Sequence, residues 1–141
     1  MNYYKYKDIE VGHTETFSVT VTNDMMANFY DITGDCNPLH LSDEFAKSGE
    51  NKSFSGRVVY GLLTASFLST LAGVYLPGEN SLIHKIEAEF PAPVYVGNVI
   101  TFTGTVVRKD DNFNIIELKV TATNKEGKKV CRGKMRIGVL A

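Results

Sequence analysis

Residues 58–78 read VVYGLLTASFLSTLAGVYLPG and carry no charged side chain over 21 residues. From residue 61 to residue 76 the segment is apolar around most of a helical circumference, as expected for a helix buried inside a protein. A membrane span is disfavoured, because the flanks lack a basic cluster and the segment contains polar residues, namely Tyr60, Thr64, Ser66, Ser69, Thr70 and Tyr75. We therefore expect a long buried helix and no membrane insertion.

Strand patterns lie on both sides of this helix. Residues 14–21 alternate apolar and polar side chains before it, and four further segments follow it, around residues 82–90, 100–106, 116–122 and 131–139. Pro91 and Pro93 end the first of these four, and turn sequences at residues 110–112 and 124–127 separate the others. This order predicts an α+β fold in which a mostly antiparallel sheet curls around the helix, as one domain over residues 1–141.

The segment between the first strand and the buried helix contains helix caps. Thr22 or Asn23 can cap a short helix that stops at Gly34, and Ser42 can cap a second one. Residues 35–41 are then expected in a loop, and residues 48–56, rich in Ser and Gly, in a surface loop. Farther along, His84 alternates with Leu82 and is expected on the inner face of the sheet, whereas His13 is expected to be exposed.

The composition excludes several function classes. The 141 residues contain 15 Lys plus Arg and 16 Asp plus Glu, so the net charge of −1 lacks the basic excess of a nucleic-acid-binding protein. Three His and two Cys without close ligand spacing argue against a metal site. No signal peptide is apparent, so Cys36 and Cys131 are expected to be reduced thiols of a cytoplasmic protein.

The run Gly-Asp-Cys-Asn-Pro-Leu-His at residues 34–40 is the strongest candidate for chemistry. Its Asn37-Pro38 step favours a turn, which would bring Asp35 and His40 toward one point. A carboxylate beside an imidazole can accept and donate protons around neutral pH. The same pair could instead form a hydrogen bond that only fastens the loop, and the spacing alone leaves both readings open.

Gly61, at the start of the buried helix, is the second candidate. Backbone N–H groups in the first turn of a helix are unpaired and favour negative charge, and a glycine lets a substrate approach them closely. Such an N–H could bind the oxygen of a thioester as it becomes enolate-like. The alternative is that Gly61 only permits the turn or close packing under the sheet.

Several motifs together resemble one family. They are residues 34–41, Val58-Val59-Tyr60-Gly61, residues 65–69 (ASFLS), residues 76–78 (LPG) and residues 90–97 (FPAPVYVG). Together these motifs resemble the MaoC-like R-specific enoyl-CoA hydratases, and the resemblance extends over nearly the whole chain. The resemblance implies a hot-dog fold and a homodimer with active sites near its interface. It also implies hydration of 2-enoyl-CoA to R-3-hydroxyacyl-CoA without a metal or redox cofactor, CoA being part of the substrate.

The resemblance assigns roles by position. Asp35 and His40 would be the catalytic pair, Gly61 the oxyanion N–H, and Ser69 a helper that positions water or the pair. The family commonly has His where this chain has Tyr60. Because a phenol is a much weaker base at pH 7, Tyr60 is expected to line or narrow the acyl pocket instead.

Substrate binding is further assigned to Asn37 within the motif and to Arg57 before the helix. Arg57, Lys52 and the alternating basic residues at positions 132, 134 and 136 could meet the phosphates of CoA, or could be solvated charges. Two other functions fit the same pattern. One is a hot-dog acyl-CoA thioesterase, which would release free CoA thiol, and the other is a non-catalytic acyl-CoA-binding module.

Overall fold

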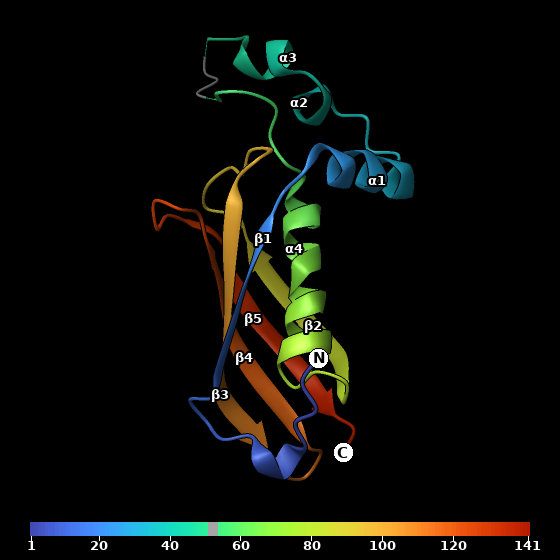
Figure 1. Cartoon of the computed structure of the whole chain (residues 1–141), viewed down its shortest axis with the longest axis vertical. Coiled ribbons are helices and arrows are strands. Elements are labelled where there is room, and N and C mark those ends of the chain that lie inside the picture. The colour runs from blue at the N-terminus through green and yellow to red at the C-terminus, as the bar shows by residue number, and fades with distance from the viewer. Residues whose placement is uncertain (51–53) are drawn as a thin grey trace.

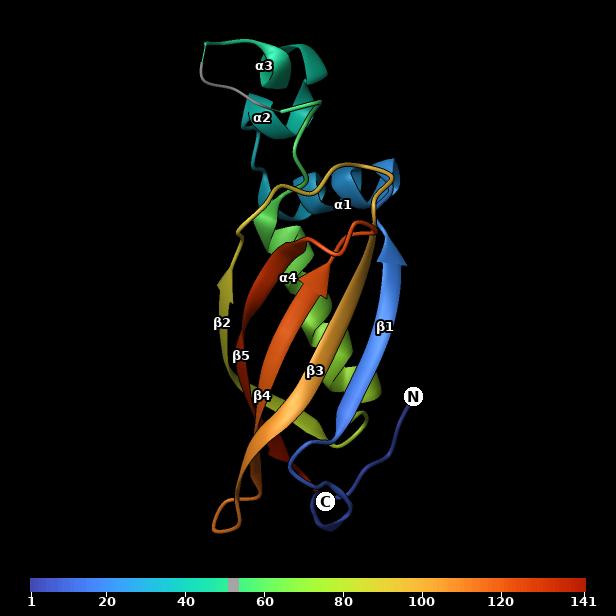
Figure 2. The same ribbon diagram turned by 90° about the vertical axis from the view of Figure 1, so that its left-hand side faces the viewer.

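The computed structural model describes residues 1–50 and 54–141. Five antiparallel strands form one sheet in the order β1-β3-β4-β5-β2, as Figure 2 shows from the open face of the sheet. The strands are β1 (Thr14–Thr20), β2 (Ser81–Glu89), β3 (Val99–Asp110), β4 (Ile115–Thr123) and β5 (Lys129–Val139). β1 and β2 are therefore the two edges of the sheet.

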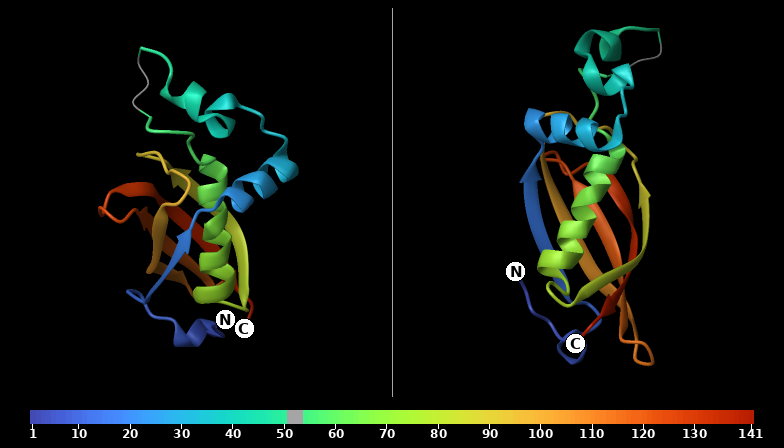
Figure 3. Two further views of the ribbon diagram at one scale, coloured as in Figure 1. Left: turned by 45° about the horizontal axis from the view of Figure 1, so that its top comes forward. Right: turned by 90° about the vertical axis from the view of Figure 1, so that its right-hand side faces the viewer.

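The long helix lies along the other face of this sheet (Figures 1 and 3). It comprises α4 (Gly61–Thr70) and continues as a wider turn, η2 (Leu71–Tyr75). Leu68 and Leu71 are almost completely buried, as are Phe102 and Met135 from the strands. Each such side chain contributes roughly 1.5–3 kcal/mol by leaving water. The expected α+β architecture, an antiparallel sheet wrapped around a central helix in the hot-dog arrangement, is thus confirmed.

Gly104 of β3 shows how closely sheet and helix pack. A Cβ atom at this position would lie 2.8 Å from Cδ2 of Leu71. The glycine therefore leaves the space that the Leu71 side chain occupies, and a larger residue would force that side chain to move.

The predicted helix caps are present. In α1 (Asn23–Thr33), the Thr22 side chain accepts a hydrogen bond from the Met25 backbone N–H, and Gly34 ends the helix with a left-handed φ of 67°. In α3 (Asp43–Lys47), the Ser42 side chain accepts from the Phe45 N–H. α1 lies across the start of α4, and the α2–α3 region extends away from the sheet (Figure 1).

The loop expected at residues 35–41 is partly helical, so that prediction was wrong. Pro38–Leu41 form the short helix α2. Asn37 caps it by accepting from the Leu39 N–H, and Pro38 fits the first helical position because its missing N–H is not needed there. In the expected surface loop, residues 48–50 and 54–56 contain neither helix nor strand, while residues 51–53, including Lys52, lie outside the described residues.

His84 does not lie on the buried face, in contrast to the prediction. The pairing register of β2 with β5 shifts between Ile83 and Lys85, so the alternation expected from the sequence changes phase at His84. His84 is exposed, and Ile83 packs against the core instead. A single irregular residue in an edge strand thus reversed the expected orientation.

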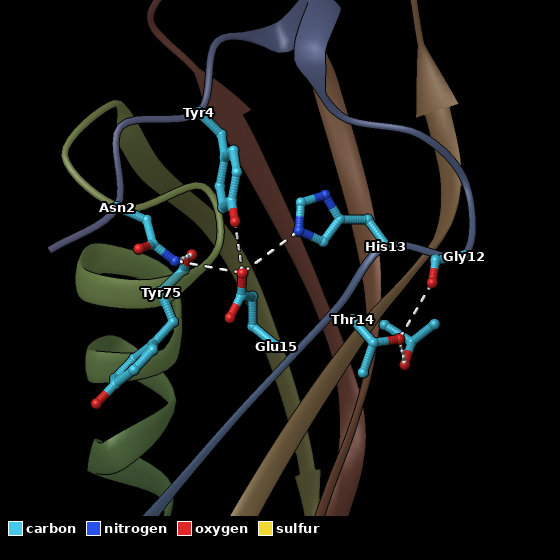
Figure 4. Close-up of polar contacts among 8 residues, drawn as sticks. Asn2, Tyr4, Gly12, His13, Thr14, Glu15 and Tyr75 are labelled. Atoms are coloured by element: carbon cyan, nitrogen blue, oxygen red, sulfur yellow. Dashed lines mark hydrogen bonds and ion pairs between the residues drawn. The ribbon is translucent and has the colours of Figure 1, made fainter.

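A polar cluster fastens the N-terminal segment to β1 and η2 (Figure 4). One carboxylate oxygen of Glu15 accepts from the Tyr4 hydroxyl at 2.7 Å and lies 3.3 Å from Nδ2 of Asn2 and 3.4 Å from Nε2 of His13. The Asn2 amide also donates to the Tyr75 carbonyl. The hydrogen bond to Glu15 raises the pKa of Tyr4. His13 is therefore half-buried, not exposed as expected.

Each described helix is too short or too polar to span a lipid bilayer.

Candidate active site

The turn predicted around Asn37-Pro38 is built from two side-chain contacts. Oδ1 of Asp35 accepts from the Asn37 N–H at 3.1 Å, and Oδ1 of Asn37 accepts from the Leu39 N–H at 3.0 Å. These contacts connect α1 to α2 and set the course of the chain between Asp35 and His40. Both Asp35 and Asn37 are exposed in the single chain.

His40 lies in α2 and has one ring nitrogen fixed by the backbone. Its Nδ1 is 2.7 Å from the carbonyl oxygen of Val58. Because a carbonyl only accepts hydrogen bonds, Nδ1 carries the proton in this contact. In the neutral imidazole Nε2 then keeps its lone pair and is the nitrogen that can take a proton.

The described side chains of Asp35 and His40 form no direct hydrogen bond with each other. Tyr60 contacts both residues instead. The Tyr60 hydroxyl donates to the Asp35 carbonyl oxygen at 2.9 Å, and the centroids of the Tyr60 and His40 rings are 4.3 Å apart. Burial, followed by the charge of Asp35, raises the pKa of Tyr60. The phenol is therefore neutral at pH 7 and remains a donor.

Gly61 begins α4 immediately after Tyr60 and borders a cleft of about 310 Å³. Apart from Thr64 the lining side chains are apolar, contributed by Phe54, Val58, Val59, Phe90, Pro91, Ala92, Pro93, Val94 and Val130. Val58 lines this cleft while its carbonyl holds His40. The segment of residues 58–61 thus connects the imidazole to an apolar cleft and to the unpaired N–H groups at the start of α4.

Ser69 and Arg57 make no described hydrogen bond to Asp35, His40 or Tyr60. Ser69 is exposed and lies eight residues along α4 from Gly61, a rise of about 12 Å. Arg57 is half-buried, and its backbone N–H donates to Oδ1 of Asp43 at 2.7 Å while its guanidinium donates to Oδ1 of Asn23. Arg57 therefore fastens α1 and α3 to the segment that leads into α4.

The basic residues of β5 all face solvent. Arg132, Lys134 and Arg136 are exposed, and Arg132 forms an ion pair with Glu89 at 2.9 Å. Across residues 1–50 and 54–141, no three His, Cys, Asp or Glu side chains are grouped so that they could hold a metal ion. The two cysteines are free, with Cys36 exposed and Cys131 buried.

Two contributors to the site were not predicted. The Val58 carbonyl orients His40, and Phe29 of α1 packs against Tyr60 with ring centroids 4.9 Å apart. A backbone carbonyl carries no residue-specific signal, so the contact of the Val58 carbonyl with His40 is evident only from the fold. Phe29 lies in the short helix predicted to stop at Gly34, and a position in a helix does not by itself indicate which side chain it contacts.

Comparisons with known proteins identify the family of the chain. Residues 9–128 match the family of the MaoC like domain. The chain is 36% identical over 95 residues to 3-hydroxybutyryl-CoA dehydratase of Methylorubrum extorquens. The aligned region covers 67% of this chain and 59% of that protein. It is 28% identical over 136 residues to (R)-specific enoyl-CoA hydratase of Rhodospirillum rubrum, covering 96% of this chain and 92% of that one.

Solved structures of R-hydratases share the fold of this chain. An (R)-hydratase from A. caviae involved in PHA biosynthesis superposes with a TM-score of 0.88 at 28% identity, covering 94% of this chain and 98% of that chain. The R-hydratase PhaJ1 from Pseudomonas aeruginosa shares the fold, with a TM-score of 0.87 at 24% identity over 96% of this chain and 84% of that one. With a family match over residues 9–128, the chain belongs to the MaoC-like domain family.

Proposed function

We propose that this protein hydrates 2-enoyl-CoA to R-3-hydroxyacyl-CoA, reversibly, with Asp35 and His40 as the acid–base pair. The observation that carries the proposal is the orientation of His40. Its Nδ1 proton is engaged by the Val58 carbonyl at 2.7 Å, so that Nε2 is available as a base beside the start of α4. Relatives named (R)-specific enoyl-CoA hydratase and 3-hydroxybutyryl-CoA dehydratase support the same reaction.

The reaction consumes one water molecule and needs two proton transfers. One proton passes from the water to the Asp35–His40 pair, and one passes from the pair to C2. The thioester carbonyl withdraws electrons from C3 of the enoyl group, and water attacks C3 while the Asp35–His40 pair removes a proton from it. The electrons of the double bond move toward the thioester oxygen, where the Gly61 N–H stabilises the enolate-like charge. The pair then delivers a proton to C2, so the net result is addition of one water molecule.

In this proposal Asn37 and Arg57 contribute to binding the thioester. Ser69 lies about 12 Å from Gly61 along α4, so its expected role in positioning water or the pair gains no support from the described contacts. Because the steps are proton transfers assisted by a polarised carbonyl, the reaction needs no metal or redox cofactor. The proposal includes a cytoplasmic location, in which Cys36 and Cys131 are reduced thiols.

A homodimer belongs to the same proposal, supported by the edge strand β2. Ile86 pairs with the core residue Met135 and so points to the helix side of the sheet, yet it is 41% exposed. Phe90 at the end of β2 is 43% exposed, and Leu62 on α4 is 69% exposed. An edge strand with unpaired backbone groups beside apolar side chains favours association with a second copy.

The proposed function is tested with purified protein and crotonyl-CoA. We expect loss of the enoyl-thioester absorbance and, in chiral analysis, the R enantiomer of 3-hydroxybutyryl-CoA. Appearance of free CoA thiol without hydration would show a thioesterase. Binding of acyl-CoA without turnover of enoyl-CoA of four to eight carbons would show a binding module. Either result would overturn the hydratase proposal.

A further inference from the structure

Tyr60 is buried at the junction of three elements. Only 2% of the residue is exposed, and it immediately precedes α4. Its hydroxyl reaches back 25 residues along the chain to the Asp35 carbonyl, at 2.9 Å. Its side chain is not among those that line the described cleft beside Gly61.

The ring of Tyr60 contacts two further elements. It packs on His40 of α2, with ring centroids 4.3 Å apart and planes inclined by 33°, and on Phe29 of α1, with centroids 4.9 Å apart. One side chain therefore contacts α1, the connection that carries Asp35, and α2. Displacement of the ring would affect Asp35 and His40 together.

The two residues before Tyr60 are each held by a backbone hydrogen bond. The Val58 N–H donates to the Leu39 carbonyl at 3.0 Å, and the Val59 N–H donates to the Val94 carbonyl at 2.8 Å. Tyr60 is thus attached to a segment anchored to the body of the protein. Asp35, in contrast, is exposed, and its described hydrogen bonds run to the Thr33 hydroxyl oxygen, the Asn37 N–H and the Tyr60 hydroxyl.

We propose that Tyr60 is a positioning residue, whose hydroxyl fixes the backbone of Asp35 and whose ring fixes the imidazole of His40, so that the two groups meet the same substrate. The role rests on the proposed hydratase function. It is an alternative to the expectation that Tyr60 lines or narrows the acyl pocket. Because the side chain acts on Asp35 and His40 and not on the bound thioester, its loss should lower kcat and leave KM nearly unchanged.

The test compares Tyr60→Phe with wild type, using kcat and KM for crotonyl-CoA and the thermal midpoint. The substitution removes the hydrogen bond to Asp35 and keeps the ring on His40. We expect kcat to fall about 10-fold, because small displacements of reacting groups cost one to two orders of magnitude in rate. KM should stay within about twofold, since the interactions that bind substrate are retained.

Tyr75→Phe is the matched control. Tyr75 lies at the far end of the same helix, where its ring stacks on Phe17 with centroids 4.8 Å apart. Removing its hydroxyl should leave both kcat and KM unchanged. Phe29→Leu provides a second variant that loosens the Tyr60 ring without altering Asp35 or His40, and it should lower kcat in the same direction.

The outcomes separate the two proposals. Unchanged kcat in Tyr60→Phe, or a change in KM and chain-length preference alone, would overturn the positioning role and leave the hydratase function standing. A wild-type protein without hydratase turnover would overturn the function and, with it, this role. If Tyr60→Phe failed to fold, an unchanged kcat in Phe29→Leu would still contradict the proposal.

Discussion

Nδ1 of His40 lies 2.7 Å from the carbonyl oxygen of Val58, and this contact selects Nε2 as the nitrogen available for proton transfer. Val58 also lines the apolar cleft that begins at Gly61. The orientation of the imidazole is therefore set by the same backbone segment that shapes the cleft, and this orientation leaves Nε2 of His40 for the proposed proton transfer.

Loss of either member of the proposed Asp35–His40 pair should abolish most of the proposed hydratase activity. Asp35→Asn and His40→Ala should each lower kcat for crotonyl-CoA about 100-fold or more, as expected when proton transfer is lost. Folding should be unaffected by Asp35→Asn because that side chain is exposed. The measurement is loss of enoyl-thioester absorbance, together with the thermal midpoint of each variant.

Asp31→Asn is the control for this prediction, because Asp31 is also exposed, on α1 near the same turn. It should retain wild-type turnover. Near-normal turnover in Asp35→Asn would mean that Asp35 only fastens the loop, which the sequence had left open.

The elements of the fold that depend on local side-chain chemistry were predictable. Thr22, Gly34 and Ser42 each cap a helix as expected, because a cap needs only a few neighbouring residues. The buried helix was evident from its uninterrupted apolar sequence. α2 was missed, because a helix of four residues has too little periodicity to distinguish it from a loop.

The site was predictable only in part, because its geometry depends on contacts between distant residues. The turn at Asn37 follows from local rules, whereas the bond from Tyr60 to Asp35 spans 25 residues. His84 was placed on the wrong face, since a register shift in an edge strand leaves no signal in an alternating pattern. The contact between His40 and the Val58 carbonyl likewise depends on the fold, because every residue has a carbonyl.

The dimer proposed from the edge strand β2 can be tested by light scattering. At low micromolar concentration the protein should show about twice the mass of the 15.6 kDa chain. Ile86→Lys should shift it toward the monomer, because a charge would be buried in an apolar interface. Phe113→Lys is the control, since Phe113 is 73% exposed in the turn after β3 and should leave the mass unchanged. A wild-type monomer with full activity would contradict the proposed assembly.

Two glycines should respond differently to alanine. A Cβ at Gly133 would lie 1.8 Å from the Glu87 carbonyl oxygen, so the backbones of β5 and β2 would have to separate. Gly133→Ala should lower the free energy of unfolding by about 3 kcal/mol. At Gly61 the nearest atoms are those of the Phe90 ring, at 3.5 Å, an ordinary contact.

Gly61→Ala should therefore fold with a normal thermal midpoint and lose activity. The added methyl group would lie 3.5 Å from the Phe90 ring, in the cleft through which we propose that the thioester approaches the N–H, and we expect kcat/KM to fall about 10- to 100-fold. Urea unfolding and the crotonyl-CoA assay measure the two effects separately. Wild-type activity in Gly61→Ala would show that the start of α4 does not bind the thioester oxygen.

Stability at high pH should depend on Tyr6. Burial, together with its hydrogen bond to Asp111 at 2.7 Å, raises the pKa of Tyr6 to about 12, above the ordinary value of 10.0. The folded state thus holds the phenol proton more tightly than the unfolded chain does. The resulting stabilisation is fully present below pH 10 and is lost as the pH rises through about 12.

Thermal unfolding followed by circular dichroism between pH 8 and pH 12 should show Tyr6→Phe losing less stability than wild type above pH 10. Tyr3→Phe serves as the control, because Tyr3 is 65% exposed, and its unfolding curve should follow that of wild type at every pH. Parallel losses of stability in Tyr6→Phe and wild type across pH 10 to 12 would show that the bond to Asp111 does not couple phenol ionisation to folding.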